Sequence, residues 1–297
     1  MKYTVYGIVF ESNYYFDYFN LCSDPTTVDM QVDVIVNPDA DIPSVNYSGE
    51  DWFEISQPGV VMYRYANHKL DILAKDDACI KSTISTVPFV LAVSQKGGVL
   101  FHAACVMSKA SRKAGIFLAP SGVGKSTIIN YLVTCQSDDF QFVSDDAIAV
   151  YVLNEIPYVY NGPTFSKLDP SIATLIGVTG REKTVDNSKI LINRNSETQK
   201  NYSNIEEQKI ELGALFFIAA LPKTESSQIK LMDQRSVSTF IKTSTVAHKF
   251  DSMAINNIVL EQEKLICDKV KSYILCYSQK AASLNLQLCG EIHERIS

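Results

Sequence analysis

A glycine-rich segment carries the clearest chemistry in the sequence: Ala119-Pro120-Ser121-Gly122-Val123-Gly124-Lys125-Ser126-Thr127. It matches the phosphate-binding (Walker A) pattern G-x-x-x-x-G-K-[ST], except that Ala119 stands at the first glycine. In such a loop, backbone N–H groups surround phosphate oxygens, and positive φ angles at glycine allow the tight turn. Lys125 would reach the β and γ phosphates of a nucleotide, and the Ser126 hydroxyl would ligate Mg²⁺. We therefore predict that residues Pro120 to Thr127 bind ATP or another nucleoside triphosphate.

The elements around this segment fit a phosphate loop. An apolar strand is expected over Ala114–Leu118, and a helix from about Lys125 to Cys135 would turn one apolar face to the core. The helix N-terminus then adds a dipole that favours anions. The alternative is an ordinary glycine-rich turn before a helix, but the order of strand, turn and helix favours the phosphate loop. Ala119 is acceptable there as long as its φ is negative.

An acidic pair follows the next apolar strand. Residues Phe140 to Val143 are expected to form that strand, and Ser144-Asp145-Asp146 stand at its carboxyl end. In open α/β sheets, ligands bind at the carboxyl ends of strands, so the pair should lie beside the loop. One carboxylate can hold Mg²⁺, while the other accepts a proton from an attacking hydroxyl. A solvated Asp-Asp turn is the alternative.

A single histidine precedes the loop in the chain. His102 lies in the apolar stretch from Val99 to Met107, which we expect to be one strand. A histidine in such a run is often a core residue with satisfied hydrogen bonds. Because its strand should adjoin the loop strand, His102 could instead orient one aspartate of the pair. Both interpretations stay open from the residues alone.

The rest of the chain predicts an α/β fold with a β-rich N-terminal domain over residues 1–96 and a catalytic domain over 97–297. Alternation of apolar and polar residues over Val28–Val34 indicates half-buried strands, and the segment Gln95-Lys96-Gly97-Gly98 suggests the boundary. The apolar segment Ser82–Ser94 is expected to be a helix or strand, with Pro88 preventing an uninterrupted helix. Further along, a strand is expected over Leu212–Leu221. Closing helices are expected over Ser236–Thr243 and Glu261–Ser272.

A long polar stretch, Arg181 to Gln208, separates the expected elements of the second half. Loops of this length within a compact domain are usually functional. Its cations suggest that it folds over an acceptor peptide: Arg181, Lys183, Lys189 and Arg194.

Composition narrows the classes of partner and compartment. A net charge of −6 and a pI near 5.3 argue against nonspecific binding to nucleic acid or to an anionic membrane. No apolar run is long enough to cross a bilayer, and the start of the chain is expected to form a strand. Seven cysteines without a CxxC pattern indicate buried thiols in a reducing compartment, which points to the cytoplasm. Four scattered histidines give no support to a zinc site.

These residues also carry a resemblance to a known family. The order Phe101-His102-Ala103, then Pro120 to Thr127, then Ser144-Asp145-Asp146 resembles the catalytic domain of HPr kinase/phosphorylase. The sequence is similar above all to the HPr kinase-like enzymes found beside ribosomal-peptide tailoring genes, including lasso-peptide precursor kinases. Classical P-loop NTPases place their metal-binding aspartate much further along the chain. The resemblance spans residues 101–146.

The resemblance implies a P-loop kinase domain that uses Mg-ATP to phosphorylate a serine of a peptide or protein. It implies that Asp145 is the catalytic base, that Asp146 is its acidic neighbour, and that His102 supports the pair. With this assignment, Ser126 and Asp146 would share the Mg²⁺, and Lys125 would neutralise the transferred phosphoryl group. The number of subunits is left open, and a homo-oligomer is compatible with the sequence.

One departure from the family separates this chain from the HPr-directed enzymes. Their Glu-Arg-Gly-Leu-Gly signature is replaced here by the segment Asn161–Pro170. This argues against recognition of HPr and against the reverse, phosphorolytic reaction. Within the segment, Lys167 matches a basic position of the peptide-tailoring relatives and could bind phosphate; a plain surface lysine is the alternative.

Other functions remain alternatives at this point. They are an HPr-type serine kinase/phosphorylase, a kinase for free serine or a sugar, and a nucleotide-binding regulatory protein without catalysis. The acceptor and the destination of the γ-phosphate separate them.

Overall fold

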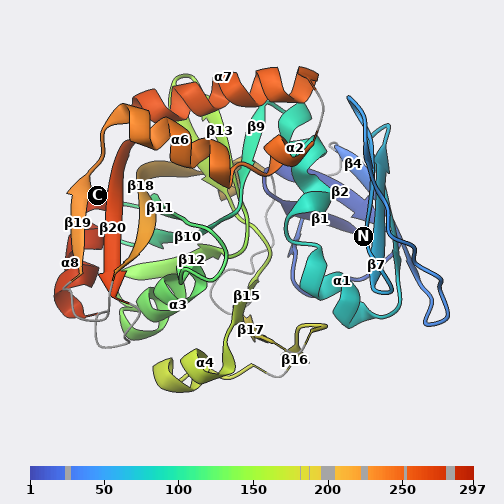
Figure 1. Cartoon of the computed structure of the whole chain (residues 1–297), viewed down its shortest axis with the longest axis horizontal. Helices are drawn as coiled ribbons and strands as arrows, with labels where there is room; N and C mark the ends of the chain where they lie inside the picture. Colours follow the sequence, from blue (N-terminus) through green and yellow to red (C-terminus); the bar gives the residue numbers. More distant parts are fainter. Residues whose placement is uncertain are drawn as a thin grey trace.

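The computed structural model describes residues 1–23, 28–180, 182–186, 188–194, 205–221, 227–250, 253–278 and 285–297. The fold is mixed α/β, with two large sheets and one small sheet (Figure 1). This agrees with the α/β class and the β-rich N-terminal part predicted from the sequence. Within the described residues, no helix is both long and apolar enough to cross a bilayer. The seven cysteines form no disulfide.

Strands of the N-terminal part form the first sheet. In β4, buried Met30, Val32 and Val34 alternate with more exposed residues, which confirms the predicted half-buried strand. The strands in spatial order are β3 (Asn20–Leu21), β1 (Lys2–Val5), β2 (Ile8–Ser12), β4 (Met30–Val36), β8 (Lys69–Ala74), β7 (Val61–Ala66), β6 (Phe53–Gln57) and β5 (Asn46–Ser48).

Short helices connect this sheet to the second one. Helix α1 (Asp77–Thr83) begins where the Asp76 side chain accepts a hydrogen bond from the Cys79 N–H at 2.7 Å. The 3₁₀ helix η1 (Val87–Phe89) and α2 (Val90–Gln95) follow. Pro88 lies in η1, so the prediction that it prevents an uninterrupted helix is confirmed.

The second sheet is formed by strands that follow α2 in the chain, from residue 98 to residue 278. Its strands in spatial order are β12 (Phe140–Ser144), β10 (Ala103–Ser108), β11 (Lys113–Leu118), β18 (Ile210–Leu221), β14 (Ile156–Tyr160), β13 (Ile148–Leu153) and β9 (Gly98–Phe101); β20 (Lys271–Ser278) also pairs with β18, and β19 (Gln228–Leu231) pairs with β20. Strands β11, β18 and β20 are parallel to one another. These parallel neighbours form the middle of the sheet.

Helices cover both faces of this sheet (Figure 1). Because successive side chains of a strand point to opposite faces, Phe117 and Phe216 pack with one pair of helices, whereas Ile116 and Leu215 join the core on the other side. The first pair is α3 (Lys125–Cys135) and α8 (Leu286–Ile296). The second pair is α6 (Gln234–Ser244) and α7 (Met253–Lys269). Helix α3 has the predicted bounds and buries the predicted apolar face.

Strand directions bring several chain segments to one edge of the sheet. Strand β10 is antiparallel to both β11 and β12, so β11 and β12 run in the same direction. Their carboxyl ends, after Leu118 and Ser144, therefore lie at one edge. The start of β10 lies at that same edge, because β10 runs the opposite way. His102, just before β10, arrives there too.

The prediction of one strand over Val99–Met107 is wrong at His102. The chain forms two strands there, β9 paired with β13 and β10 paired with β11 and β12. At the break, the His102 N–H donates to the Ser244 carbonyl at 2.7 Å instead of to a neighbouring strand. Both strands are buried throughout, so their apolar pattern is continuous across the break.

Two other expectations need correction near the C-terminus. Helix α7 begins at Met253 rather than Glu261 and ends at Lys269, and the last two residues of the expected helix, Lys271 and Ser272, begin β20 instead. Short apolar runs suit buried helices and buried strands equally, which explains the error. The expected strand over Leu212–Leu221 and helix over Ser236–Thr243 are confirmed as β18 and α6.

A small sheet and a short helix stand beside α3. The sheet has the order β15 (Phe165–Leu168), β17 (Ile190–Asn193) and β16 (Glu182–Lys183), and α4 (Pro170–Ile176) follows β15. Helix α3 packs against both β15 and α4. The remaining 3₁₀ turns are η2 (Ile205–Gln208) and η3 (Val246–Lys249).

The largest apolar core contains residues from both predicted domains, including Tyr6 and Phe89 from one and Leu100 and Phe250 from the other. The division between residues 96 and 97 stays a prediction.

Candidate functional site

The glycine-rich segment forms a tight loop between β11 and α3. Gly122 and Gly124 have φ angles of +82° and +111°, the region that glycine tolerates best. Ala119 has no positive φ, so the condition for alanine at that position is met. A Cβ on Gly124 would lie 1.8 Å from the Tyr277 hydroxyl oxygen, so a side chain has no room there.

Tyr277, near the end of β20, contacts the loop. Its hydroxyl donates to the Val123 carbonyl at 3.2 Å. Nothing in the sequence points to Tyr277, because only the pairing of β20 with β18 brings it near the loop.

Lys125 begins α3 and is buried, with 6% of its surface exposed. Its Nζ donates to the carbonyls of Ala119 at 2.6 Å and Pro120 at 3.2 Å. Burial lowers the pKa of Lys125, while the nearby Asp145 and Asp146 carboxylates oppose that shift. The ammonium thus lies in a concave loop with two acids close by.

Asp145 accepts hydrogen bonds at both of its carboxylate oxygens. Its Oδ1 accepts from the Ser126 hydroxyl at 3.0 Å and from the Asp146 N–H at 2.9 Å. Its Oδ2 accepts from the Ser166 hydroxyl and from the Lys167 N–H, the latter at 3.2 Å. Burial raises the pKa of Asp145, although the hydroxyl donors partly offset the shift. The solvated-turn alternative is therefore wrong for Asp145, which is 1% exposed.

Asp146 has a different environment on the next residue. Its Oδ2 accepts from Lys167 Nζ at 2.7 Å and from the Ser85 hydroxyl. Burial alone would raise its pKa, but the Lys167 ammonium and these hydrogen bonds hold the pKa of Asp146 well below its usual range. Asp146 also has a φ of +74°, a strained value for a residue with a side chain.

His102 lies next to Asp146, as expected if it orients one aspartate of the pair. Its Nδ1 is 2.8 Å from the Asp146 carbonyl oxygen and 3.6 Å from Asp146 Oδ1. The side chain is 31% exposed, so it is not an enclosed core histidine. The plain surface alternative for Lys167 is also wrong, because its side chain is only 12% exposed and pairs with Asp146.

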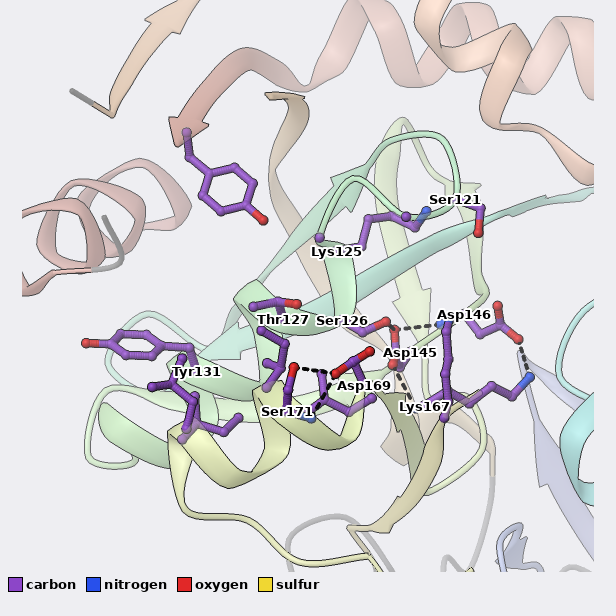
Figure 2. A pocket seen from close by; sticks show the side chains of 18 of the residues that line it. Ser121, Lys125, Ser126, Thr127, Tyr131, Asp145, Asp146, Lys167, Asp169 and Ser171 are labelled. Atoms are coloured by element: carbon purple, nitrogen blue, oxygen red, sulfur yellow. Dashed lines mark hydrogen bonds and ion pairs between the residues drawn. The ribbon is translucent and has the colours of Figure 1, made fainter. Parts of the chain in front are cut away.

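These groups line one cleft of about 610 Å³ (Figure 2). The sequence-predicted residues that line it are His102, Ser121, Gly122, Gly124, Lys125, Ser126, Thr127, Asp145 and Asp146. Two predicted loop residues, Pro120 and Val123, do not line it and contribute carbonyls to Lys125 and Tyr277 instead.

A second hydrogen-bond layer supports the cleft from α3. The Asn130 side chain donates to the Ser126 carbonyl at 2.7 Å and to the Ser166 hydroxyl at 2.6 Å. Arg194 Nη2 donates to Asn130 Oδ1 at 2.5 Å and to Thr134 Oγ1 at 3.2 Å. No sequence pattern points to Asn130 or Ser166, because both act through contacts between distant elements.

The polar stretch contributes to the site in part. Lys189 lines the cleft, and Lys183 lies in β16. Arg194 is 5% exposed and bound to α3, so the expectation that it contacts an acceptor peptide is wrong. Arg181 lies outside the described residues, as do residues 195–204, so the rest of that hypothesis stays a prediction.

The cleft has a polar end and an apolar end. Figure 2 shows Asp146 and Lys167 at one side, Tyr131 at the other, and Ser126 and Asp145 between them. The apolar part of the lining comes from α3, with Tyr131 and Cys135, and from α4, which packs against α3 and contributes Ile172, Leu175 and Ile176. This shape suits an elongated ligand with an anionic part and an apolar part.

Comparisons with known proteins add little to this geometry. No family model matches the chain. No curated protein matches it either. Solved structures do match, among them the Hpr(Ser) kinase/phosphatase from Coxiella burnetii, at a TM-score of 0.34 and 10% identity over 66% of this chain and 95% of the other. Likeness at that level says nothing about activity, so the residues of the cleft are what bear on function.

Proposed function

We propose that the chain is a kinase that transfers the γ-phosphoryl group of ATP, or of another nucleoside triphosphate, to the serine hydroxyl of a peptide or protein. The observation that carries the proposal is the cleft itself, where a phosphate loop with Lys125 faces two differently held aspartates. A loop of this kind binds phosphates, and the acids supply metal binding and hydroxyl activation.

The lining fits a nucleoside triphosphate. Lys125 and the loop N–H groups suit the β and γ phosphates. Thr127, Tyr131 and Cys135 follow one another at four-residue intervals, so they lie on one face of α3. Along this face, the nucleoside would lie between α3 and α4 against the apolar end of the cleft.

The geometry favours an exchange of the roles that the resemblance implies for the two acids. Ser126 Oγ lies 3.0 Å from Asp145 Oδ1, so Ser126 and Asp145 are the oxygen pair that would hold Mg²⁺. Such an ion would neutralise charge on the phosphates. Asp146 stands beside His102 at the accessible side and would meet the acceptor hydroxyl.

The transfer follows from these positions. Lys125 holds the phosphates, and Asp146, kept ionised by Lys167, accepts a hydrogen bond from the serine hydroxyl and orients its oxygen. The serine oxygen bonds to the γ-phosphorus as the bond to the β–γ bridging oxygen breaks, and the hydroxyl proton passes to Asp146. The nucleoside diphosphate leaves. His102 supports the Asp146 end through its 2.8 Å contact.

The acceptor class rests on the resemblance of the histidine, loop and acid motifs to HPr kinase-like enzymes. The replaced segment Asn161–Pro170 favours the peptide-tailoring group, and a lasso-type precursor peptide, over HPr. A cytoplasmic location is part of the proposal, because free thiols and ATP suit a reducing compartment.

The test is incubation of the protein with Mg-ATP and candidate acceptors, followed by intact-mass measurement. We expect one or more phosphoryl groups on a serine-containing precursor peptide. Phosphorylation of HPr, free serine or a sugar instead would replace the acceptor but retain the kinase. If ATP binds and its γ-phosphate passes only to water or nowhere, the nucleotide-binding regulatory alternative is correct.

The apolar end gives a separate prediction. Leu175 is 58% exposed and lines the cleft, so Leu175→Asn should weaken ATP binding by roughly tenfold without harming the fold, because apolar contact with the nucleoside is lost. Binding of inorganic tripolyphosphate should not change. Calorimetric titration of both ligands measures this.

Its matched control is Thr174→Asn, on the preceding residue of α4 and outside the cleft lining. That variant should bind ATP like the unmodified protein. Equal weakening of tripolyphosphate and ATP by Leu175→Asn would place the nucleoside elsewhere.

A further inference from the structure

We propose that the N-terminal part of the chain completes the catalytic site, with Ser85 as a positioning residue for Asp146 and Lys167. The proposal deepens the kinase function and rests on it for its kinetic consequences. It assigns to the β-rich part a role that the motifs of the second half do not reveal.

Ser85 stands between the two charged side chains. It is fully buried in the segment between α1 and η1. Its hydroxyl donates to Asp146 Oδ2 and accepts from Lys167 Nζ at 3.2 Å, while Lys167 Nζ and Asp146 Oδ2 are 2.7 Å apart. Three polar groups therefore form a closed triangle, and one corner comes from outside the predicted catalytic domain.

The backbone of Ser85 is itself fixed by the first sheet. The Tyr6 hydroxyl donates to the Ser85 carbonyl at 2.6 Å. Tyr6 lies in the turn between β1 and β2, is fully buried, and has a φ of +55°. A residue with a side chain keeps such a φ only when its surroundings impose it.

The turn that holds Tyr6 is anchored on the second half of the chain. The Tyr6 N–H donates to the Asn161 carbonyl at 2.9 Å, and the Tyr151 hydroxyl donates to the Tyr6 carbonyl at 2.9 Å. A Cβ on Gly162 would lie 2.8 Å from the Tyr6 ring, so the two parts are in close contact there. Hydrogen bonds thus run from β13 through Tyr6 to Ser85 and on to Asp146.

These contacts fix the orientation of the Asp146 carboxylate. Ser85 and Lys167 bind Asp146 Oδ2, which turns Oδ1 toward His102. Two further charged groups lie near Asp146: Asp145, whose Oδ1 accepts from the Asp146 N–H, and the Lys125 ammonium. A carboxylate fixed at one oxygen presents the other to an acceptor hydroxyl in a single orientation, and orientation of this kind has a large effect on rate.

The first experiment measures kinetics of Ser85→Ala with Mg-ATP and the acceptor. We expect kcat to fall by about 10- to 100-fold, with the KM for ATP within about twofold of the unmodified protein, because nucleotide contacts are untouched. Ser85→Thr retains the hydroxyl and should recover most of the loss. Tyr6→Phe, which keeps the ring, should lower kcat in the same manner and by less.

The second measurement does not depend on activity. In a crystal structure of Ser85→Ala we expect the Asp146 carboxylate to turn away from His102, whereas it should stay in place in Ser82→Ala. Ser82 is a matched control, since its hydroxyl donates within α1, to the Ala78 and Cys79 carbonyls. A kcat for Ser85→Ala within twofold of the unmodified value, or an unmoved Asp146, would overturn the proposal.

The two measurements separate this proposal from the proposed function. If the unmodified protein phosphorylates no acceptor, the kinase assignment fails, and the crystal comparison alone decides whether Ser85 positions Asp146. If transfer occurs and Asp146 moves in Ser85→Ala without a change in kcat, the kinase stands and the positioning role is wrong.

Discussion

Lys125→Ala should abolish phosphoryl transfer, with kcat/KM lower by about a thousandfold or more. The reason is electrostatic, because Lys125 is the cation inside the phosphate loop and charge on the transferred group is then left without its main partner. The fold should persist. Keeping the charged Lys125 ammonium buried costs free energy in the folded state, and burial lowers its pKa. Because Lys125→Ala removes that cost, we expect the free energy of unfolding to change little.

The measurement is a transfer assay together with thermal unfolding of both proteins. Lys113→Ala is a suitable control, because Lys113 begins the same strand β11 but pairs with Glu211 at the far end from the loop. It should retain full activity. A Lys125→Ala protein that transfers phosphoryl groups within a few-fold of the unmodified rate would remove the loop from the mechanism.

Asp146→Asn should reduce kcat by about 10²- to 10⁴-fold while ATP still binds, because the amide cannot accept the hydroxyl proton. Asp145→Asn should act differently. It changes the oxygen pair formed with Ser126, so its main effect should be a higher Mg²⁺ concentration for half-maximal activity. Steady-state kinetics across a Mg²⁺ series distinguish the two effects.

The opposite result for the two variants would assign the base to Asp145. If Asp145→Asn removes catalysis and Asp146→Asn alters the Mg²⁺ requirement, the base is Asp145, as the family resemblance implies, and the exchange of roles is wrong. Asp138→Asn, at an exposed position before β12, serves as the control and should change neither quantity.

The local part of the site could be predicted from sequence because it depends on short-range physics. Residues Ala114–Cys135 combine an apolar strand, glycines at two positions of positive φ, and a helix with one apolar face, and each requirement is visible in neighbouring residues. The position of Asp145 and Asp146 followed from one rule, that ligands bind at the carboxyl ends of strands. The structure places them in the loop's cleft.

Two predictions are wrong because the same apolar pattern is compatible with more than one secondary structure. The buried run through His102 reads as one strand, yet it contains a break that places the imidazole beside Asp146. Likewise, the helix expected over Glu261–Ser272 includes the first two residues of β20, and no pattern marks the strand that brings Tyr277 to the loop. Periodicity alone does not mark where one element ends inside an apolar run.

Residues close together in the chain were enough to predict the tight glycine-rich loop, the helix that follows it and the acidic pair after the next strand, since each depends on short-range contacts. The difference between the two acids arises from the packing of distant segments. Asp145 is enclosed by Ser126 and Ser166, and Asp146 is held by Lys167 and Ser85. Hydrogen-bond partners from distant segments meet only when sheets and helices pack, and no pattern of neighbouring residues encodes that meeting.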